Sequence, residues 1–303
     1  MDDVIAVVGV PSALGGQLPG GGHHGMARAP GELRRRGLLD RLRESGLRPR
    51  DGGDVAVEPA YRDDGDPRAK NRAAIAEYLP REAAMVSRAV AGGERLLILG
   101  GDCCAHAGAM AGLRRARPER RLAIAWFDAH GDFNTPDTTP SGHVWGMPFA
   151  MLCGRGEPDL VAACDGPSVE ERHAALLGGQ VLDEPESRAI SASPLAHFGA
   201  GMLGTPGGLA ALAGWAGAVA DEVDGLYVAV DHDVLDADEV AWSVTMPETG
   251  GMRLGTAIAA VRVLAAAIPI VGYGASAMNF DRGDAERTVD AAARLAEAAL
   301  GSR

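Results

Sequence analysis

The segment LAIAWFDAHGD, residues 122–132, contains the two patterns on which the fold prediction depends. Its first six residues are all apolar, which is typical of a short strand buried on both faces of a parallel sheet. The polar sequence Asp128-Ala129-His130-Gly131-Asp132 follows where that strand is expected to end. In open α/β sheets the ligand crevice lies outside the carboxyl ends of the strands. The segment therefore predicts both a central strand and a functional site at its end.

Further apolar runs alternate with alanine-rich stretches that repeat apolar residues at three- and four-residue spacing. We expect strands over Val4–Val10, Leu96–Leu99, Leu122–Phe127, Leu226–Val230 and Ile268–Gly272. We expect helices over Pro30–Leu42, Ala69–Val90, Ala105–Ala116, Gly207–Ala220, Gly255–Ala267 and Ala285–Leu300. This alternation predicts a three-layer α-β-α fold with a mainly parallel sheet, in which residues 1–303 form a single domain.

The composition narrows the classes of partner. The 41 acidic and 29 basic residues give a net charge of −12, which argues against nucleic acid and anionic membrane surfaces. No apolar run approaches the roughly 18 residues that span a bilayer, and the acidic start Met1-Asp2-Asp3 lacks the basic region of a secretory signal. We therefore expect a cytoplasmic protein with a small-molecule ligand, and its four cysteines should be reduced.

Polar residues follow three of the predicted strands, at residues 100–103, 128–132 and 231–233. Side chains two apart in an extended segment share a face, so Asp231 and Asp233 should point together while His232 points away. The same spacing groups Asp128 with His130 and Asp132.

A single aspartate after a strand is most often a helix cap or a turn residue. The combined set is different, because four carboxylates in one pocket repel one another unless cations lie among them. Oxygen ligands with an imidazole suit Mn²⁺ or a similar ion, so the sequence predicts a metal site with two ions.

These motifs resemble those of the ureohydrolases, which include arginase, agmatinase, formiminoglutamase and the hydroxyarginine amidinohydrolases. Asp128–Asp132 and Asp231–Asp233 match the two most diagnostic motifs, and Ala29–Arg34 and Leu177–Gly179 extend the match over most of the chain. The resemblance implies an arginase-like fold, assembly into homotrimers or hexamers, and an amino-acid substrate.

The resemblance also implies the ligand set. Asp128 and Asp231 would bridge two Mn²⁺ ions, Asp132 would complete one site as a catalytic residue, and His130 with Asp233 would complete the other. A water activated by both ions would attack the guanidino carbon of the substrate.

The first departure from the family is Cys103, which stands where the motif normally has a metal-binding histidine. A thiolate is softer than imidazole, so this ligand leaves Co²⁺, Fe²⁺ or Zn²⁺ open beside Mn²⁺. A cysteine at this motif position resembles the pattern of the hydroxyarginine amidinohydrolases of antibiotic biosynthesis. The alternative is that Cys103 is a small buried residue in a degenerate site. His106 could reach the same pocket, or it could be a helix-surface or core residue.

The second departure lies in the loop after Asp132. Asn134 and Ser141 resemble the arginase residues that hold the substrate's α-carboxylate, which agmatinases lack. By the same resemblance, Asp183 and Glu186 would receive the α-amino group. Arginases place a proton-shuttling histidine where this chain has Trp145, so His143 could act as the general acid if the loop is rearranged.

The third departure follows the last strand, where Gly274 and Ala277 replace two acids of the family. Burying a guanidinium without a carboxylate partner is costly. N-hydroxyarginine is less basic, and Ser276 could contact its hydroxyl group. We therefore expect a metal-dependent hydrolase that cleaves a C–N bond of N-hydroxyarginine. The alternatives are a hydrolase of another amide, amidine or formimino compound, and a weakly catalytic pseudoenzyme that binds an amino acid or a partner subunit.

Overall fold

The computed structural model describes residues 4–16, 25–57, 65–240 and 243–301. Within these residues, eight strands form one sheet in the order β2-β1-β3-β8-β7-β4-β5-β6, and every neighbouring pair is parallel. The strands are β1 (Val4–Val10), β2 (Arg48–Asp54), β3 (Arg95–Gly100), β4 (Leu122–Asp128), β5 (Ala174–Gly178), β6 (Ala196–Phe198), β7 (Gly225–Asp231) and β8 (Ile270–Ser276).

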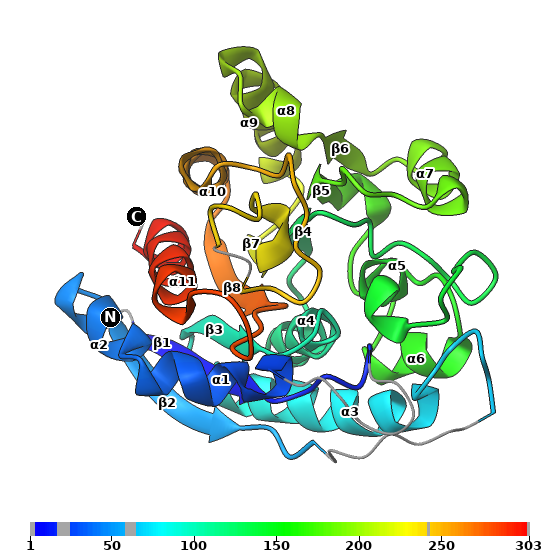
Figure 1. Cartoon of the computed structure of the whole chain (residues 1–303), viewed down its shortest axis with the longest axis horizontal. Coiled ribbons are helices and arrows are strands. Elements are labelled where there is room, and N and C mark those ends of the chain that lie inside the picture. The colour runs from blue at the N-terminus through cyan, green and yellow to red at the C-terminus, as the bar shows by residue number, and fades with distance from the viewer. Residues whose placement is uncertain (1–3, 17–24, 58–64, 241–242, 302–303) are drawn as a thin grey trace.

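Helices cover both faces of the sheet, which confirms the three-layer prediction (Figure 1). One core contains Ile5 and Val7 of β1 and packs against α1 (Gly25–Arg35), α2 (Leu38–Glu44), α8 (Ala200–Leu203), α9 (Pro206–Ala220), α10 (Leu254–Ala267) and α11 (Ala285–Leu300). The other contains Ala6 and Val8 and packs against α3 (Arg72–Ala89), α4 (Ala105–Ala116), α5 (Pro148–Leu152), α6 (Pro158–Ala163) and α7 (Glu184–Ser191). The alternation along β1 thus divides its apolar side chains between two cores.

The predicted elements are present, with differences that have local causes. The helices over Ala105–Ala116 and Ala285–Leu300 have the predicted bounds, but the single helix expected over Pro30–Leu42 is two helices. The break lies at Gly37, whose φ of 79° is in the left-handed region that favours glycine. The sequence did not predict β2, β5 or β6. Edge strand β2 is polar and mostly exposed, so it has no apolar run to reveal it.

The sheet order brings four strand ends together in the middle of the molecule. Strands β3, β8, β7 and β4 are consecutive neighbours, so the segments that follow them meet at one edge (Figure 1). This edge contains the polar residues singled out in the sequence. Within the described ranges, we find no helix with the length and hydropathy of a membrane span.

Candidate functional site

Asp128, the last residue of β4, is held by two hydrogen bonds. The indole Nε1 of Trp126 donates to its Oδ2 at 3.0 Å, and the backbone N–H of His130 donates to its Oδ1 at 2.7 Å. Trp126 is fully buried and stacks on Phe149, with ring centroids 5.1 Å apart. The orientation of the Asp128 carboxylate is therefore fixed from the core side. Sequence reasoning missed Trp126, although its position two residues before Asp128 places it on the same face.

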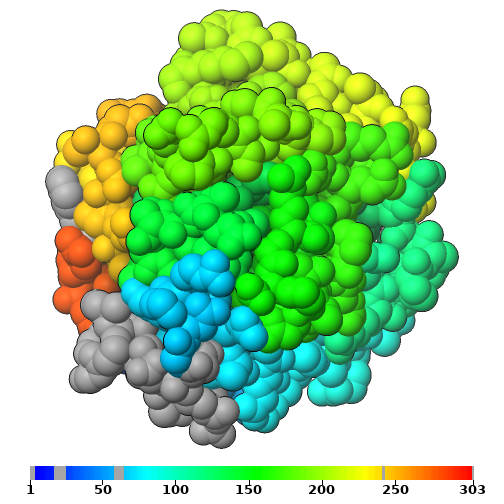
Figure 2. Space-filling view, turned by 90° about the vertical axis from the view of Figure 1, so that its right-hand side faces the viewer, coloured from blue at the N-terminus to red at the C-terminus, as the bar shows by residue number. Residues whose placement is uncertain are grey.

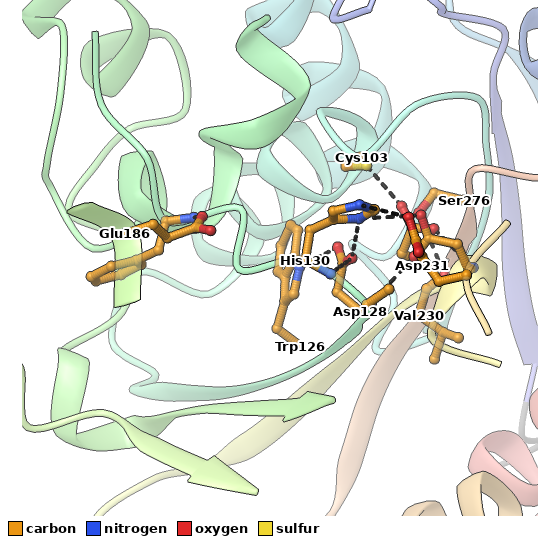
Figure 3. Close-up of polar contacts among 12 residues, drawn as sticks. Cys103, Trp126, Asp128, His130, Glu186, Val230, Asp231 and Ser276 are labelled. Atoms are coloured by element: carbon orange, nitrogen blue, oxygen red, sulfur yellow. Dashed lines mark hydrogen bonds and ion pairs between the residues drawn. The ribbon is translucent and has the colours of Figure 1, made fainter. Parts of the chain in front are cut away.

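Two groups of side chains at this edge have ligand atoms close enough to hold a metal ion. Cys103, Asp128 and Asp132 form one group, and Asp128, His130 and Asp233 form the other, with atoms within 4.8 Å of one another in each. Asp128 belongs to both groups. Figure 3 shows His130 facing Asp128 and the end of β7. In this view Cys103 lies on the side of His130 away from Asp128.

Asp231 ends β7 and joins this cluster. The Cys103 thiol donates to its Oδ2 at 2.8 Å, and its Oδ1 accepts the backbone N–H of Asp233 at 3.2 Å. Asp231 and Asp233 share the pocket, as predicted, but strand alternation is not the cause. The strand ends at Asp231, and a 3-10 turn, η3 (His232–Val234), redirects the chain. His232 is buried and does not line the pocket.

Burial disfavours the charged form of three carboxyl groups in this cluster, those of Asp132, Asp231 and Asp233. Burial, followed by the neighbouring Asp128 and Asp231, raises the pKa of Asp132 well above its usual value. Burial and then Asp233 and Asp128 do the same for the pKa of Asp231, and burial and then Asp128 raise the pKa of Asp233 to about 6. The Oδ2 atom of Asp132 is buried and has no hydrogen-bond partner among the described residues. These are the properties expected of carboxylates arranged around a cation.

His130 and Cys103 complete the donor set. Burial disfavours the charged imidazole, yet Asp233 and Asp128 raise the pKa of His130 well above its usual value. Burial and three nearby aspartates raise the pKa of the Cys103 thiol. A divalent ion would displace these protons, because ligands bind metals in their deprotonated forms. The donor set of carboxylate, imidazole and thiol therefore fits a divalent metal.

A pocket of about 270 Å³ opens over the cluster. It brings together most of the site residues predicted from the sequence, but Asp128, His143 and Ser276 do not line it. Its walls include the ligand candidates Cys103, His130, Asp132, Asp231 and Asp233, the predicted substrate contacts Asn134, Ser141, Asp183 and Glu186, and also Trp145 and Ala277.

Asn134 and Asp183 lie on opposite loops and are directly bonded. The Asn134 amide donates to Asp183 Oδ2 at 3.1 Å, and its Oδ1 accepts the Thr138 hydroxyl at 2.9 Å. The Ser141 hydroxyl is exposed at the pocket rim and accepts the backbone N–H of His143 at 3.2 Å. The polar atoms proposed for the amino-acid end of a substrate are thus held at one end of the pocket.

Glu186 supports the loop as well as lining the pocket. Its carboxylate accepts the N–H groups of Phe133 at 2.9 Å and Asp183 at 3.4 Å, the second as part of a capping box at the start of α7. A Cβ at Gly131 would lie 2.5 Å from its carboxyl carbon, so glycine is needed for this approach. Burial raises the pKa of Glu186 to about 7 despite these bonds. Its contact with substrate stays a prediction.

His143 is a predicted site residue that, like Asp128, does not line the pocket. Its Nε2 is buried without a hydrogen-bond partner in the part of the chain that the structure describes, and burial followed by the charge of Lys70 lowers its pKa. Lys70 also donates to the Ser141 carbonyl at 2.7 Å, and Figure 2 shows the blue segment before α3 lying against the green loop. Trp145, and not His143, lines the pocket wall, and its backbone N–H donates to the Gly15 carbonyl at 3.2 Å. A proton-carrying role for His143 stays a prediction that requires a rearranged loop.

Ser276 ends β8 and Ala277 follows it, and the two side chains differ in direction. Ala277 lines the pocket with a φ of 59°, whereas Ser276 is fully buried and does not line it. The expected contact of Ser276 with substrate is therefore wrong, because its hydroxyl is bonded to His106 Nε2 at 2.8 Å. His106 also contacts the Tyr227 hydroxyl at 2.9 Å, and burial lowers its pKa to about 3. His106 is a core residue.

Comparison with known proteins identifies the family of this site. The model of the arginase family matches residues 3–301. The chain belongs to the arginase family. It is 32 % identical to arginase from Bacillus caldovelox over 266 residues, which cover 87 % of this chain and 86 % of that protein. It is 28 % identical to arginase from Bacillus subtilis over 305 residues, covering 100 % and 99 %.

The solved structures agree with this family assignment. The crystal structure of Bacillus caldovelox arginase superposes with a TM-score of 0.90 at 29 % identity, covering 99 % of both chains. The protein is therefore an arginase-type hydrolase. This member of the arginase family has acidic clusters after β4 and β7, and it has Cys103, Trp145 and Ala277 at the pocket.

Proposed function

We propose that this arginase-family hydrolase cleaves a C–N bond in the guanidino-type group of an arginine-like amino acid, with N-hydroxyarginine as the preferred substrate. The observation that carries the proposal is the pocket wall at Ala277. This residue is 5 % exposed and offers a methyl group where a cationic guanidinium would need a carboxylate. An N-hydroxyguanidino group is less basic and can bind in its neutral form.

The residues that would hold two divalent ions are those of the acidic cluster, Cys103, Asp128, His130, Asp132, Asp231 and Asp233. Such ions, when bound, lower the pKa of water and polarise the group under attack. Trp126 orients the shared ligand Asp128 through its indole N–H. Mn²⁺ suits the oxygen ligands, and the sulfur of Cys103 leaves Co²⁺, Fe²⁺ or Zn²⁺ as candidates.

The chain's own polar residues would hold the other end of the substrate. Asn134 and Ser141 present an amide and a hydroxyl group that can donate to an α-carboxylate, and Asp183 can accept from an α-amino group. Because agmatine has no carboxylate, this arrangement disfavours it. Assembly into trimers or hexamers, a single domain and a cytoplasmic location stay predictions from the sequence.

The test is a substrate panel with defined metals. The purified protein is loaded separately with Mn²⁺, Co²⁺ and Zn²⁺ and incubated with arginine, N-hydroxyarginine and agmatine, and urea and hydroxyurea are measured. We expect hydroxyurea from N-hydroxyarginine at a kcat/KM well above that for either other substrate. Equal turnover of arginine would contradict the argument from Ala277, and brisk turnover of agmatine would contradict the roles of Asn134 and Ser141.

A further inference from the structure

The imidazole of His130 has one ring nitrogen in the metal cluster and one outside it. Its Nδ1 lies 3.3 Å from both Asp128 Oδ1 and Asp233 Oδ2, on the side where a metal ion would be bound. Its Nε2 points the other way, is buried, and has no hydrogen-bond partner in the described part of the chain. A carboxylate oxygen, Glu248 Oε1, lies 4.0 Å from this Nε2.

A histidine that binds a metal through Nδ1 is neutral and carries its proton on Nε2. A buried N–H without an acceptor is unfavourable, and metal-binding histidines almost always donate this proton to a carboxylate, a carbonyl group or water. Such a partner fixes the tautomer and the ring orientation. The chemistry of His130 therefore calls for an acceptor on the side where Glu248 lies.

The loop that carries Glu248 is attached to the turn that carries the metal ligands. The Ala237 N–H donates to the Glu248 carbonyl at 2.9 Å, and the Gly250 N–H donates to Asp236 Oδ2 at 2.8 Å. Asp236 and Ala237 follow Asp233 after only two residues. The backbone of Glu248 is thus fixed relative to the ligand cluster, while its side chain, 29 % exposed, retains room to turn. A small rotation, or one water molecule, closes the 4.0 Å gap.

We propose that Glu248 is a positioning residue for the metal centre: its carboxylate accepts the Nε2 proton of His130, directly or through one water, and so presents Nδ1 to the ion. The proposal concerns metal binding and does not depend on which substrate is hydrolysed. No sequence pattern indicates this role, because Glu248 lies outside the three polar segments that follow the predicted strands.

The test measures the affinity of the metal-free protein for Mn²⁺ by titration calorimetry, without substrate. We expect Glu248→Ala to weaken the binding of one ion by about 10- to 100-fold, the range typical for loss of such a partner. Glu248→Gln keeps an acceptor oxygen and should recover most of this loss. Asp238→Asn, which alters an exposed carboxylate nearby, is the matched control and should bind like the unaltered protein.

Two further readouts separate positioning from a general structural effect. The melting temperature of the metal-free protein should be the same in Glu248→Ala and in the unaltered protein. In ¹⁵N NMR spectra of the Zn²⁺-loaded protein, the Nε2 proton of His130 should exchange faster with solvent in Glu248→Ala than in the unaltered protein. Mn²⁺ affinity in Glu248→Ala equal to that of the unaltered protein would overturn the proposal. So would a loss in Glu248→Gln as large as that in Glu248→Ala, since charge alone would then be responsible.

Discussion

Restoring an acid at position 277 should give the protein a measurable activity on arginine. Two hydrogen bonds hold the backbone there: the Ala277 N–H donates to the Gly101 carbonyl at 2.8 Å, and the Ala277 carbonyl accepts the Thr245 N–H at 3.2 Å. Its φ of 59° is left-handed, but alanine already has a Cβ, so glutamate adds little backbone strain. The new side chain would extend into the pocket of about 270 Å³ that Ala277 lines.

The expected gain follows from the hydrogen bonds that the new carboxylate can accept. A hydrogen bond to a charged group contributes about 1.5–3 kcal/mol, which corresponds to roughly 10- to 150-fold in kcat/KM for arginine. N-hydroxyarginine, bound in its neutral form, should gain little. Ala277→Gln is the control, because it adds the same volume without the charge.

The assay compares urea release from arginine with hydroxyurea release from N-hydroxyarginine in the Mn²⁺-loaded variants. The reasoning is refuted if Ala277→Glu and Ala277→Gln change arginine turnover by the same factor. It is also refuted if the unaltered protein already turns over arginine as fast as Ala277→Glu does.

Three other changes test the polar groups around the site. Glu82 is fully buried without a hydrogen-bond partner in the described residues, and burial followed by Asp102 raises its pKa well above 4.5. The folded state thus keeps the Glu82 proton, whereas the unfolded state releases it above about pH 4.5. As the pH rises, the contribution of Glu82 to the free energy of unfolding therefore falls by up to about 1.4 kcal/mol per pH unit, until the pKa of the folded state is reached. Urea unfolding of the metal-free protein should show Glu82→Gln gaining on the unaltered protein from pH 5 to 7.5, and a constant difference would contradict this. Trp126→Phe removes the 3.0 Å bond to Asp128 and should weaken Mn²⁺ binding by about tenfold in calorimetry, whereas unchanged affinity would show that Asp128 needs no such support. Cys103→His should shift the preference from Zn²⁺ toward Mn²⁺ in a competition titration, and an unchanged ratio would show that Cys103 does not bind metal.

The sequence was sufficient to predict the central part of the sheet and the cluster at its edge. Strands such as Leu122–Asp128 are buried on both faces, so their apolar runs are visible, and the polar residues after them could only face the crevice. Asp128 belongs to both ligand groups and Asp231 to neither, so the bridging roles that the resemblance implies for these two residues stay predictions.

Other features depend on contacts that no local pattern reveals. Asp231 and Asp233 come together through the 3-10 turn η3 rather than along a strand. Ser276 turns into the core because His106 and Tyr227, distant in sequence, provide its buried partners there. Glu248 lies near His130 through a tertiary contact that the sequence does not reveal, whereas the position of Trp126 two residues before Asp128 is a local signal that could have been used.

The position of β8 has a consequence for how the protein is made. This strand is the last in the sequence, yet it lies between β3 and β7 in the sheet. Until the ribosome has synthesised residues 270–276, the nascent chain lacks the strand that joins the segment carrying Cys103 to the segment carrying Asp231 and Asp233. The candidate metal site can therefore be complete only after residues 270–276 have been synthesised, and a chain truncated before β8 would lack the strand that brings these segments together.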